Sequence, residues 1–407
     1  MSKRWQIFTA FSLLYVLAYF YRVSLAVMAK DLAAEAHLSA TQLGTLSGAF
    51  FYAFALTQLP LGPLLDRFGG KRTALAFGLV TLAGLFTFST ATSYPLLLAG
   101  RILLGIGSAS VLMSALRCFT HWFTLQEFGR VSGFIIAIGN LGNIAGTAPL
   151  AWAIGVCGWR FTFAVIALAQ VICLLLLIFM GREAPEGIEF RSQGKSPVAG
   201  LAQVITTADY WLLAVIAFFW YANYMAIQGL WGGPYLMDAV GLSREAAGLY
   251  LLAISLGFLV GCLFVGRLAE RIGSQRRTML LGQSAMLLGM GLFLGPAMAI
   301  AKPLLLALLF LLGLSVAAGV AIYPLIRQRF PHEIAGTALT AVNFFILLGA
   351  AVMQQVMGWL IERAPHGSAG YPPAAYHQAF LVPVGGLALA ILLFRNLRET
   401  VSRSGGA

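Results

Sequence analysis

Charged side chains are scarce in this chain. Only 10% of its 407 residues are Asp, Glu, Lys or Arg, and just 14 residues are acidic, whereas 60% are hydrophobic. A soluble domain of this length could not bury so much apolar surface in its core. The composition therefore excludes an ordinary soluble protein and predicts a polytopic membrane protein, most of whose apolar surface contacts lipid.

Cysteine and histidine are also scarce. The four cysteines, Cys118, Cys157, Cys173 and Cys262, lie in or at the ends of apolar runs and form no Cys-x-x-Cys pair, so neither a disulfide framework nor a metal site is expected. The five histidines fall in loops or at the ends of runs. Without a nucleophile or metal-ligand spacing inside the runs, the sequence argues against an enzyme, and we expect no cofactor.

Apolar runs of about 20 residues, long enough to cross a bilayer as helices, fill most of the chain, and they lack the alternation of a membrane β-barrel. We expect an all-α polytopic membrane protein with twelve transmembrane helices in two pseudo-symmetric six-helix halves, 1–181 and 209–407, joined by a cytoplasmic linker, 182–208. The expected spans are roughly 7–28, 43–61, 73–90, 96–116, 131–156 and 161–180, then 210–231, 246–265, 278–294, 303–325, 336–360 and 379–394.

Lys and Arg are unevenly distributed among the predicted loops. With the N-terminus in the cytoplasm, few of the 26 basic residues fall on the opposite side, namely Lys30, Arg160, Arg244, Lys302 and Arg363. Cytoplasmic loops of membrane proteins carry an excess of positive charge. We therefore expect a bacterial inner-membrane protein with both termini in the cytoplasm. The basic loops also account for the net charge of +12, so no nucleic-acid partner is needed.

A short segment occurs twice, about half a chain length apart, each time after a long apolar run. The spacing of the two copies is identical, which indicates a duplicated membrane protein. The shared positions are Gly62, Leu64, Asp66, Arg67, Gly69 and Arg72 in the first copy and Gly266, Leu268, Glu270, Arg271, Gly273 and Arg276 in the second.

The repeated segment is suited to conformational gating. Gly62 and Gly69 would let the chain turn tightly between two helices, and Asp66 would pair with a basic residue across the interface between the halves. Such pairs would stabilise an outward-open state and would break when the inner side opens; a plain basic loop is the alternative. The expected basic partners are Arg130 for Asp66 and Arg327 or Arg329 for Glu270.

The segment 62–72 resembles the loop between the second and third helices of the major facilitator superfamily, and 266–276 resembles its weaker echo in the second half. Arg101, followed by Gly105 and Gly107, is similar to the fourth-helix pattern of that family. The resemblance covers the whole chain and implies a carrier that functions as a monomer. Residues of the first two spans, Tyr19, Arg22 and Gln58 among them, look like the start of its anion:cation symporter branch.

Only two charged residues, Arg22 and Arg101, lie clearly within the predicted spans, and no Asp or Glu lies at mid-membrane. A carrier of cations or sugars driven by a buried carboxylate would need such an acid. Guanidinium groups facing a cavity favour an anion instead, because Arg can hold a carboxylate by two parallel hydrogen bonds. Alternatively, Arg22 extends to the lipid headgroups and Arg101 hydrogen-bonds backbone carbonyls.

Further polar side chains fall at helical spacing on the predicted spans. Tyr15, Tyr19 and Arg22 share one helix face. In the fifth span, a glycine-rich face offers close helix packing as the alternative to substrate binding. In the seventh, Gly232, Gly233 and Pro234 predict a bend that acts as a gate. The candidate substrate contacts are Tyr15, Tyr19, Arg22, Arg101, Asn140, Asn143, Tyr221, Asn223, Tyr224, Gln228, Tyr323, Asn343 and Gln354.

These features predict a secondary active transporter that moves a small organic anion by alternating access, as a symporter coupled to protons or sodium ions. An exporter of amphipathic drugs or metabolites is one alternative, and a transporter of siderophore-like metal chelates is a second. A membrane sensor or scaffold that binds without moving its ligand is a third.

Overall fold

The computed structural model of the chain describes residues 2–185, 202–330, 332–365 and 370–397, so most of the expected linker lies outside the described residues. Within these ranges the chain is helical throughout, and no strand occurs. Eleven helices are long and apolar enough to cross a membrane, and the bent pair α7 and α8 provides a twelfth span. The predicted fold class is confirmed.

The described part of the first half forms nine helices, because three of its six expected spans are each divided between two consecutive helices. Their bounds are α1 (Lys3–Val23), α2 (Leu25–Ala36), α3 (Ala40–Phe68), α4 (Gly70–Thr90), α5 (Tyr94–Ser108), α6 (Val111–Trp122), α7 (Leu125–Ala145), α8 (Ala148–Cys157) and α9 (Trp159–Met180).

The second half has longer single helices and several short 3₁₀ turns. Its elements are α11 (Ala208–Met225), the π-helix η1 (Ala226–Trp231), α12 (Gly232–Asp238), α13 (Arg244–Ile272), α14 (Gln275–Met290), η2 (Gly291–Leu294), η3 (Pro296–Met298), α15 (Lys302–Ala317), η4 (Ala318–Ala321), α16 (Ile322–Arg329), α17 (His332–Glu362) and α18 (Pro373–Phe394).

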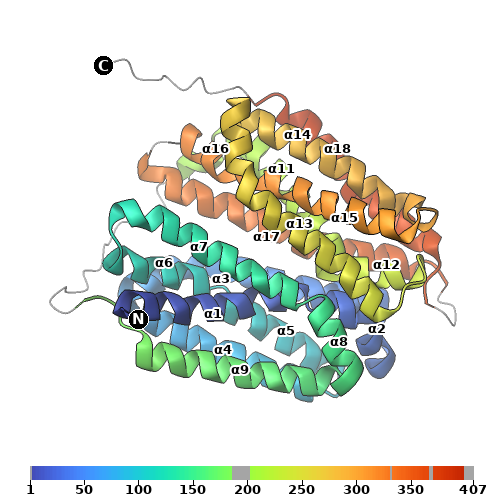
Figure 1. Ribbon diagram of the computed structural model, residues 1–407, viewed down its shortest axis with the longest axis horizontal. Coiled ribbons are helices and arrows are strands. Elements are labelled where there is room, and N and C mark those ends of the chain that lie inside the picture. Colours follow the sequence, from blue (N-terminus) through green and yellow to red (C-terminus); the bar gives the residue numbers. More distant parts are fainter. Residues whose placement is uncertain (1, 186–201, 331, 366–369, 398–407) are drawn as a thin grey trace.

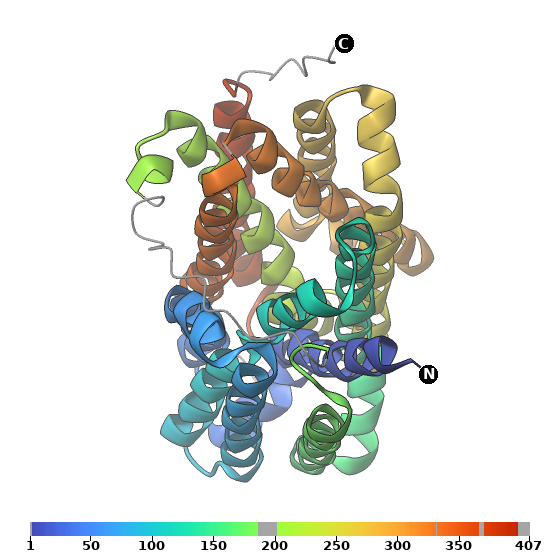
Figure 2. The ribbon, with the colours of Figure 1, turned by 90° about the vertical axis from the view of Figure 1, so that its left-hand side faces the viewer.

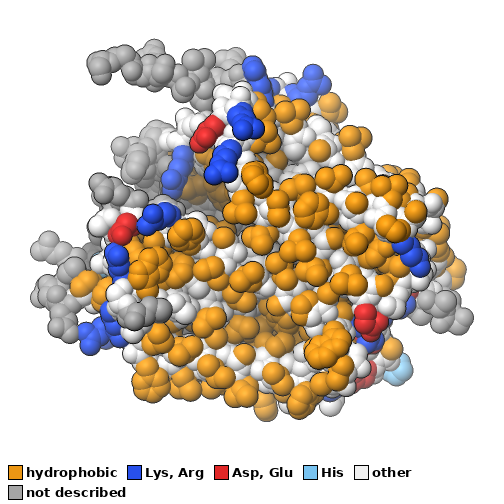
Figure 3. Space-filling view, in the orientation of Figure 1, with side chains coloured by type: hydrophobic (Ala, Val, Ile, Leu, Met, Phe, Trp, Pro, Cys, Tyr) orange, Lys and Arg blue, Asp and Glu red, His pale blue; other side chains and the backbone are white. Residues whose placement is uncertain are grey.

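The helices run side by side, and α1 begins at the same end of the bundle at which α18 ends, on the left in Figure 1. We call this the terminal end and the opposite one the far end. Figure 2, viewed from the terminal end, shows the first half as one group of helices below the second half. In Figure 3 a broad apolar surface crosses the middle of the molecule, and most of the visible Lys and Arg gather toward the terminal end.

Two helix boundaries correct the sequence-based expectations. Gly62 and Gly266 lie inside α3 and α13, not in turns. Only Gly69 (φ 80°) and Gly273 (φ 70°) turn the chain, in a left-handed conformation that favours glycine. The fifth span, expected to be continuous, bends by 41° between α7 and α8, where a proline sits in the first turn of α8.

Candidate functional site

Arg22 lies in the last turn of α1, and α2 begins two residues after α1 ends. Because α2 continues to Ala36 and buries most of its first two turns, Arg22 is inside the helical stretch Lys3–Ala36 and not at its end. The side chain is 8% exposed, and its buried Nε has no hydrogen-bond partner. A buried and incompletely paired cation is costly unless a ligand or water completes its contacts.

Aromatic rings of the first half surround this guanidinium. Its carbon lies 4.4 Å from the ring centroid of Tyr19 and 4.8 Å from that of Phe54 on α3. Tyr15 and Tyr19 pack edge to face with centroids 4.8 Å apart, and their hydroxyl oxygens are 3.3 Å apart. The predicted face of α1 therefore exists, and the cation–π contacts keep Arg22 inside the protein.

The second half completes the cluster with two tyrosines. Tyr221 of α11 is an electrostatic neighbour of Arg22, and Tyr323 of α16 is an electrostatic neighbour of Arg22 and Tyr19. Tyr323 is 36% exposed. We call the set Tyr15, Tyr19, Arg22, Phe54, Tyr221 and Tyr323 the Arg22 cluster.

Arg101 on α5 contacts backbone instead. Its Nη1 donates to the carbonyl of Tyr21 (2.9 Å) and its Nε to that of Leu46 (3.3 Å), and its guanidinium lies 4.9 Å from the Phe50 ring centroid. The side chain is fully buried. This arrangement ties α5 to α1 and α3 and favours the structural alternative for Arg101 over substrate contact.

The polar residues of α7 contact their own helix. Asn143 donates to Asn140 (3.1 Å), and Asn140 donates to the carbonyl of Ile136 (3.1 Å). The glycine face of the same helix packs on α1, where a Cβ added at Gly142 would lie 1.9 Å from the carbonyl oxygen of Val16. These contacts favour the helix-packing alternative for this span.

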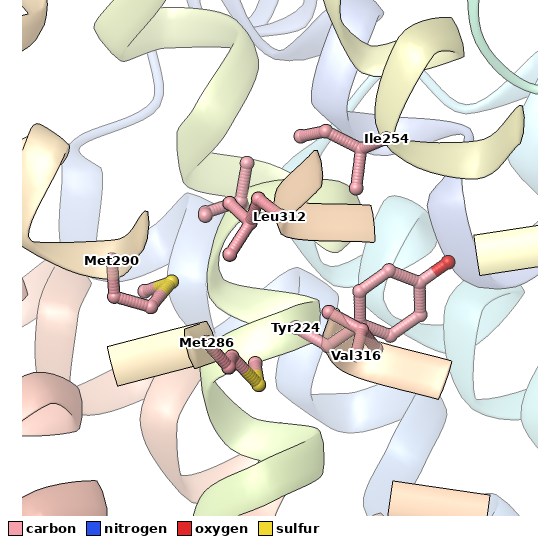
Figure 4. A pocket seen from close by; sticks show the side chains of 7 residues that line it. Tyr224, Ile254, Met286, Met290, Leu312 and Val316 are labelled. Carbon is pink, nitrogen blue, oxygen red and sulfur yellow. The ribbon is translucent and has the colours of Figure 1, made fainter. Parts of the chain in front are cut away.

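The seventh span also directs most of its polar groups to neighbouring helices. Asn223 donates to the carbonyl of Pro383 on α18 (2.8 Å), and Gln228 donates to Ser255 on α13 (2.8 Å). Tyr224 stacks on Phe258 and lines a narrow apolar gap within the second half; Figure 4 shows its hydroxyl pointing away from the sulfur atoms that line the gap. Instead of a bend at the Gly-Gly-Pro sequence, the span contains the π-helix η1 and continues into α12.

On the eleventh span, Gln354 takes part in helix packing. Its side-chain Nε2 donates to the Met225 carbonyl, and its backbone carbonyl accepts from the Trp231 indole (3.0 Å). Asn343, on the same helix, is half-buried.

At the far end, the two halves are joined by polar contacts. Two ion pairs, Lys30 with Asp238 and Asp31 with Arg244, cross the interface. Tyr376 also donates to Asp238. In addition, the Glu362 carboxylate of α17 accepts from the Ser39 hydroxyl (2.9 Å) and the Thr41 amide (2.8 Å) at the start of α3.

At the terminal end, no ion pair between the halves occurs among the described residues. Arg4 pairs with Glu127 inside the first half, and Arg329 pairs with Asp209 inside the second. The expected pairing of Glu270 with Arg327 or Arg329 belongs to the outward-open state and stays a prediction. Within the described ranges, five charged members of the repeated segments and Arg130 form no ion pair; the five are Asp66, Arg67, Arg72, Glu270 and Arg271. Arg276 donates to the Arg395 carbonyl.

These observations describe two helical halves that are closed against each other at one end and enclose a cationic, aromatic cluster between them. The sequence model described as Major Facilitator Superfamily matches residues 11–352 and 221–406. The chain belongs to the major facilitator superfamily. It is therefore a transport protein and not an enzyme, as the sequence predicts.

Individual relatives span nearly the whole chain. The chain is 27% identical to the probable sulfoacetate transporter SauU of Cupriavidus necator, with 89% of this chain and 88% of the relative covered. It is 26% identical to the gentisate transporter of Corynebacterium glutamicum, with 81% and 75% covered. A solved bacterial homologue of the lysosomal transporter Spinster, titled inward-facing and unoccupied, has a similar fold, with a TM-score of 0.78 at 18% identity and 97% and 96% of the chains covered.

Proposed function

We propose that this protein is a secondary active transporter that carries a small organic anion across the bacterial inner membrane by alternating access, in symport with a proton or sodium ion. The Arg22 cluster is the observation that carries the proposal. The Arg22 guanidinium has a buried Nε without a hydrogen-bond partner and lies among tyrosines of both halves, on which it has the largest electrostatic effect of any ionised residue. Such a site attracts an anion and repels a cation.

The relatives support this substrate class. Sulfoacetate and gentisate, named for two of them, are both small organic anions. The aromatic neighbours of Arg22 would contact the uncharged body of the substrate, and their hydroxyl groups offer hydrogen bonds to its polar substituents.

The orientation of the chain determines which side of the membrane each end of the bundle faces. With both termini in the cytoplasm, the closed far end faces the periplasm and the structure is an inward-facing state. The repeated segments at the terminal end then act in the opposite state. There, Asp66 and Glu270 would find their basic partners across the interface as the cytoplasmic side closes.

Uptake into proteoliposomes tests the proposal. We expect wild-type protein to accumulate labelled gentisate, and Arg22→Gln to bind it about 10- to 100-fold more weakly, since hydrogen bonds to a charged group contribute about 1.5–3 kcal/mol. Arg363→Gln, which removes an exposed far-end arginine, is the matched control. If only cationic amphipaths raise the melting temperature of the purified protein, and if Arg22→Gln does not change this effect, the anion is rejected as the substrate class and an exporter is favoured.

A further inference from the structure

The charge of the Arg22 cluster limits which anions it can hold. Two intramembrane arginines could together bind a dianion, but Arg101 is fully buried and spends two of its nitrogens on backbone carbonyls of other helices. Withdrawing it would leave those carbonyls without their partner. The Nη2 of Arg101 has no partner either, but the side chain is 0% exposed, whereas Arg22 is 8% exposed. Arg22 is therefore the guanidinium that remains for the substrate.

The other members of the cluster are neutral. Arg22 has the largest electrostatic effect of any ionised residue on Tyr15, Tyr221 and Tyr323. The site thus has a charge of +1. A bound monoanion makes it neutral, whereas a dianion leaves one uncompensated negative charge away from bulk water, which is costly.

The surroundings of Arg22 also indicate the shape of the ligand. The rings of Tyr19 and Phe54 lie on the guanidinium, whereas its buried Nε lacks a partner. A carboxylate can approach such a group in the guanidinium plane and accept from its edge. Tyr15, Tyr19 and Tyr221 are the electrostatic neighbours of Arg22, and tyrosine side chains suit an aromatic body with few charges.

We propose, building on the function above, that the substrate is a monocarboxylate with an uncharged aromatic body and that the site discriminates against dicarboxylates of the same skeleton. The discrimination comes from the commitment of Arg101 to the helix backbone. A second cation placed in the cluster would reverse it.

Binding to the purified full-length protein tests this with two ligand pairs that differ in one carboxylate, benzoate with terephthalate and gluconate with glucarate. We expect the monocarboxylate of each pair to bind about tenfold or more tightly than its dicarboxylate, and benzoate to bind more tightly than gluconate. Tighter binding of the dicarboxylates would overturn the inference and leave the anion transporter intact. Binding of neither charge class, with cations binding instead, would reject the proposed function itself.

A charge-switch variant sharpens the test. Tyr323→Lys adds a cation beside Arg22 at a position that is 36% exposed, so the longer side chain has room. We expect it to raise dicarboxylate affinity about tenfold, whereas the uncharged control Tyr323→Met keeps the wild-type preference. An unchanged preference in a folded Tyr323→Lys would count against the charge rule, and the wild-type comparison decides the matter if this variant does not fold.

Discussion

The interface between the two halves is built differently at its two ends. At the far end, Gly233 of α12 approaches α2 so closely that an added Cβ would lie 1.7 Å from the Ala26 carbonyl oxygen, and ion pairs cross the interface around this contact. At the terminal end, the ion pairs of the described residues stay within one half, such as Arg4 with Glu127.

This difference shows how one interface can be both closed and reversible. The close backbone approach at Gly233 sets the geometry of closure, because any larger residue would hold the helices apart. The ion pairs around it are partly exposed, and such pairs contribute about 0–1 kcal/mol each. Several weak polar contacts can break one after another, so the far end can open at a modest free-energy cost.

Gly233→Val should have the largest effect. Its side chain would overlap the α2 backbone, so the closed far end becomes inaccessible and we expect transport to fall more than tenfold. Labelling of a cysteine placed at Ala40, which is buried at the far end, should become faster in a background without the native cysteines.

The matched control for this substitution is Gly385→Val on α18, where an added Cβ meets no atom within 4 Å. Slow labelling of Ala40→Cys in the Gly233→Val variant would show that the close approach does not control closure.

The ion pair of Lys30 with Asp238 should contribute less. The Asp238 side chain is 4% exposed. Each single substitution leaves the other member of the ion pair without its partner. We expect Lys30→Met and Asp238→Asn each to speed far-end labelling about fivefold, equivalent to about 1 kcal/mol. The double variant should show less than the sum of the two effects, because both remove the same contact.

Arg4→Gln is the control for the comparison of the single and double variants of Lys30 and Asp238. Because Arg4 pairs within the first half at the terminal end, this substitution should leave far-end labelling unchanged. Strictly additive single effects would mean that Lys30 and Asp238 do not act through each other.

The sequence predicts the fold well because hydrophobic runs and loop charge follow directly from the bilayer environment. It also predicts the face of α1 with Tyr19 and Arg22, since helical spacing determines which residues share a face. It does not identify Phe54, because an apolar ring in an apolar span gives no signal. Nor can it separate Arg22 from Arg101, since only the packing of α5 on α1 and α3 determines which guanidinium meets a carbonyl.

The far-end contacts are hidden from the sequence for a related reason. Lys30 and Asp238 are some 200 positions apart, and a single charged residue at the end of a span is compatible with simple exposure to water. Their pairing depends on how α2 meets α12 in one conformation, which no local pattern specifies.

Glu35 offers the smallest test, because it lies at the far end but pairs inside the first half. Its carboxylate accepts from the indole of Trp159 (2.6 Å) and from Arg160 (2.7 Å). Partial burial opposes ionisation, yet these hydrogen bonds outweigh it and hold the pKa of Glu35 below its usual value. A depressed pKa means that the stabilisation is present above the usual carboxyl pKa and is lost as the pH falls through the lowered one.

We therefore expect Glu35→Gln to lower the melting temperature by about 2 °C or less at neutral pH, because exposed ion pairs are weak. The difference from wild type should vanish in acid, where the wild-type carboxyl is protonated as well. Far-end labelling should not change at either pH, since the contact does not cross the interface. A change in labelling would show that the contact of Glu35 with Trp159 and Arg160 is coupled to opening of the far end. Residues that do not bridge the halves would then also take part in that opening.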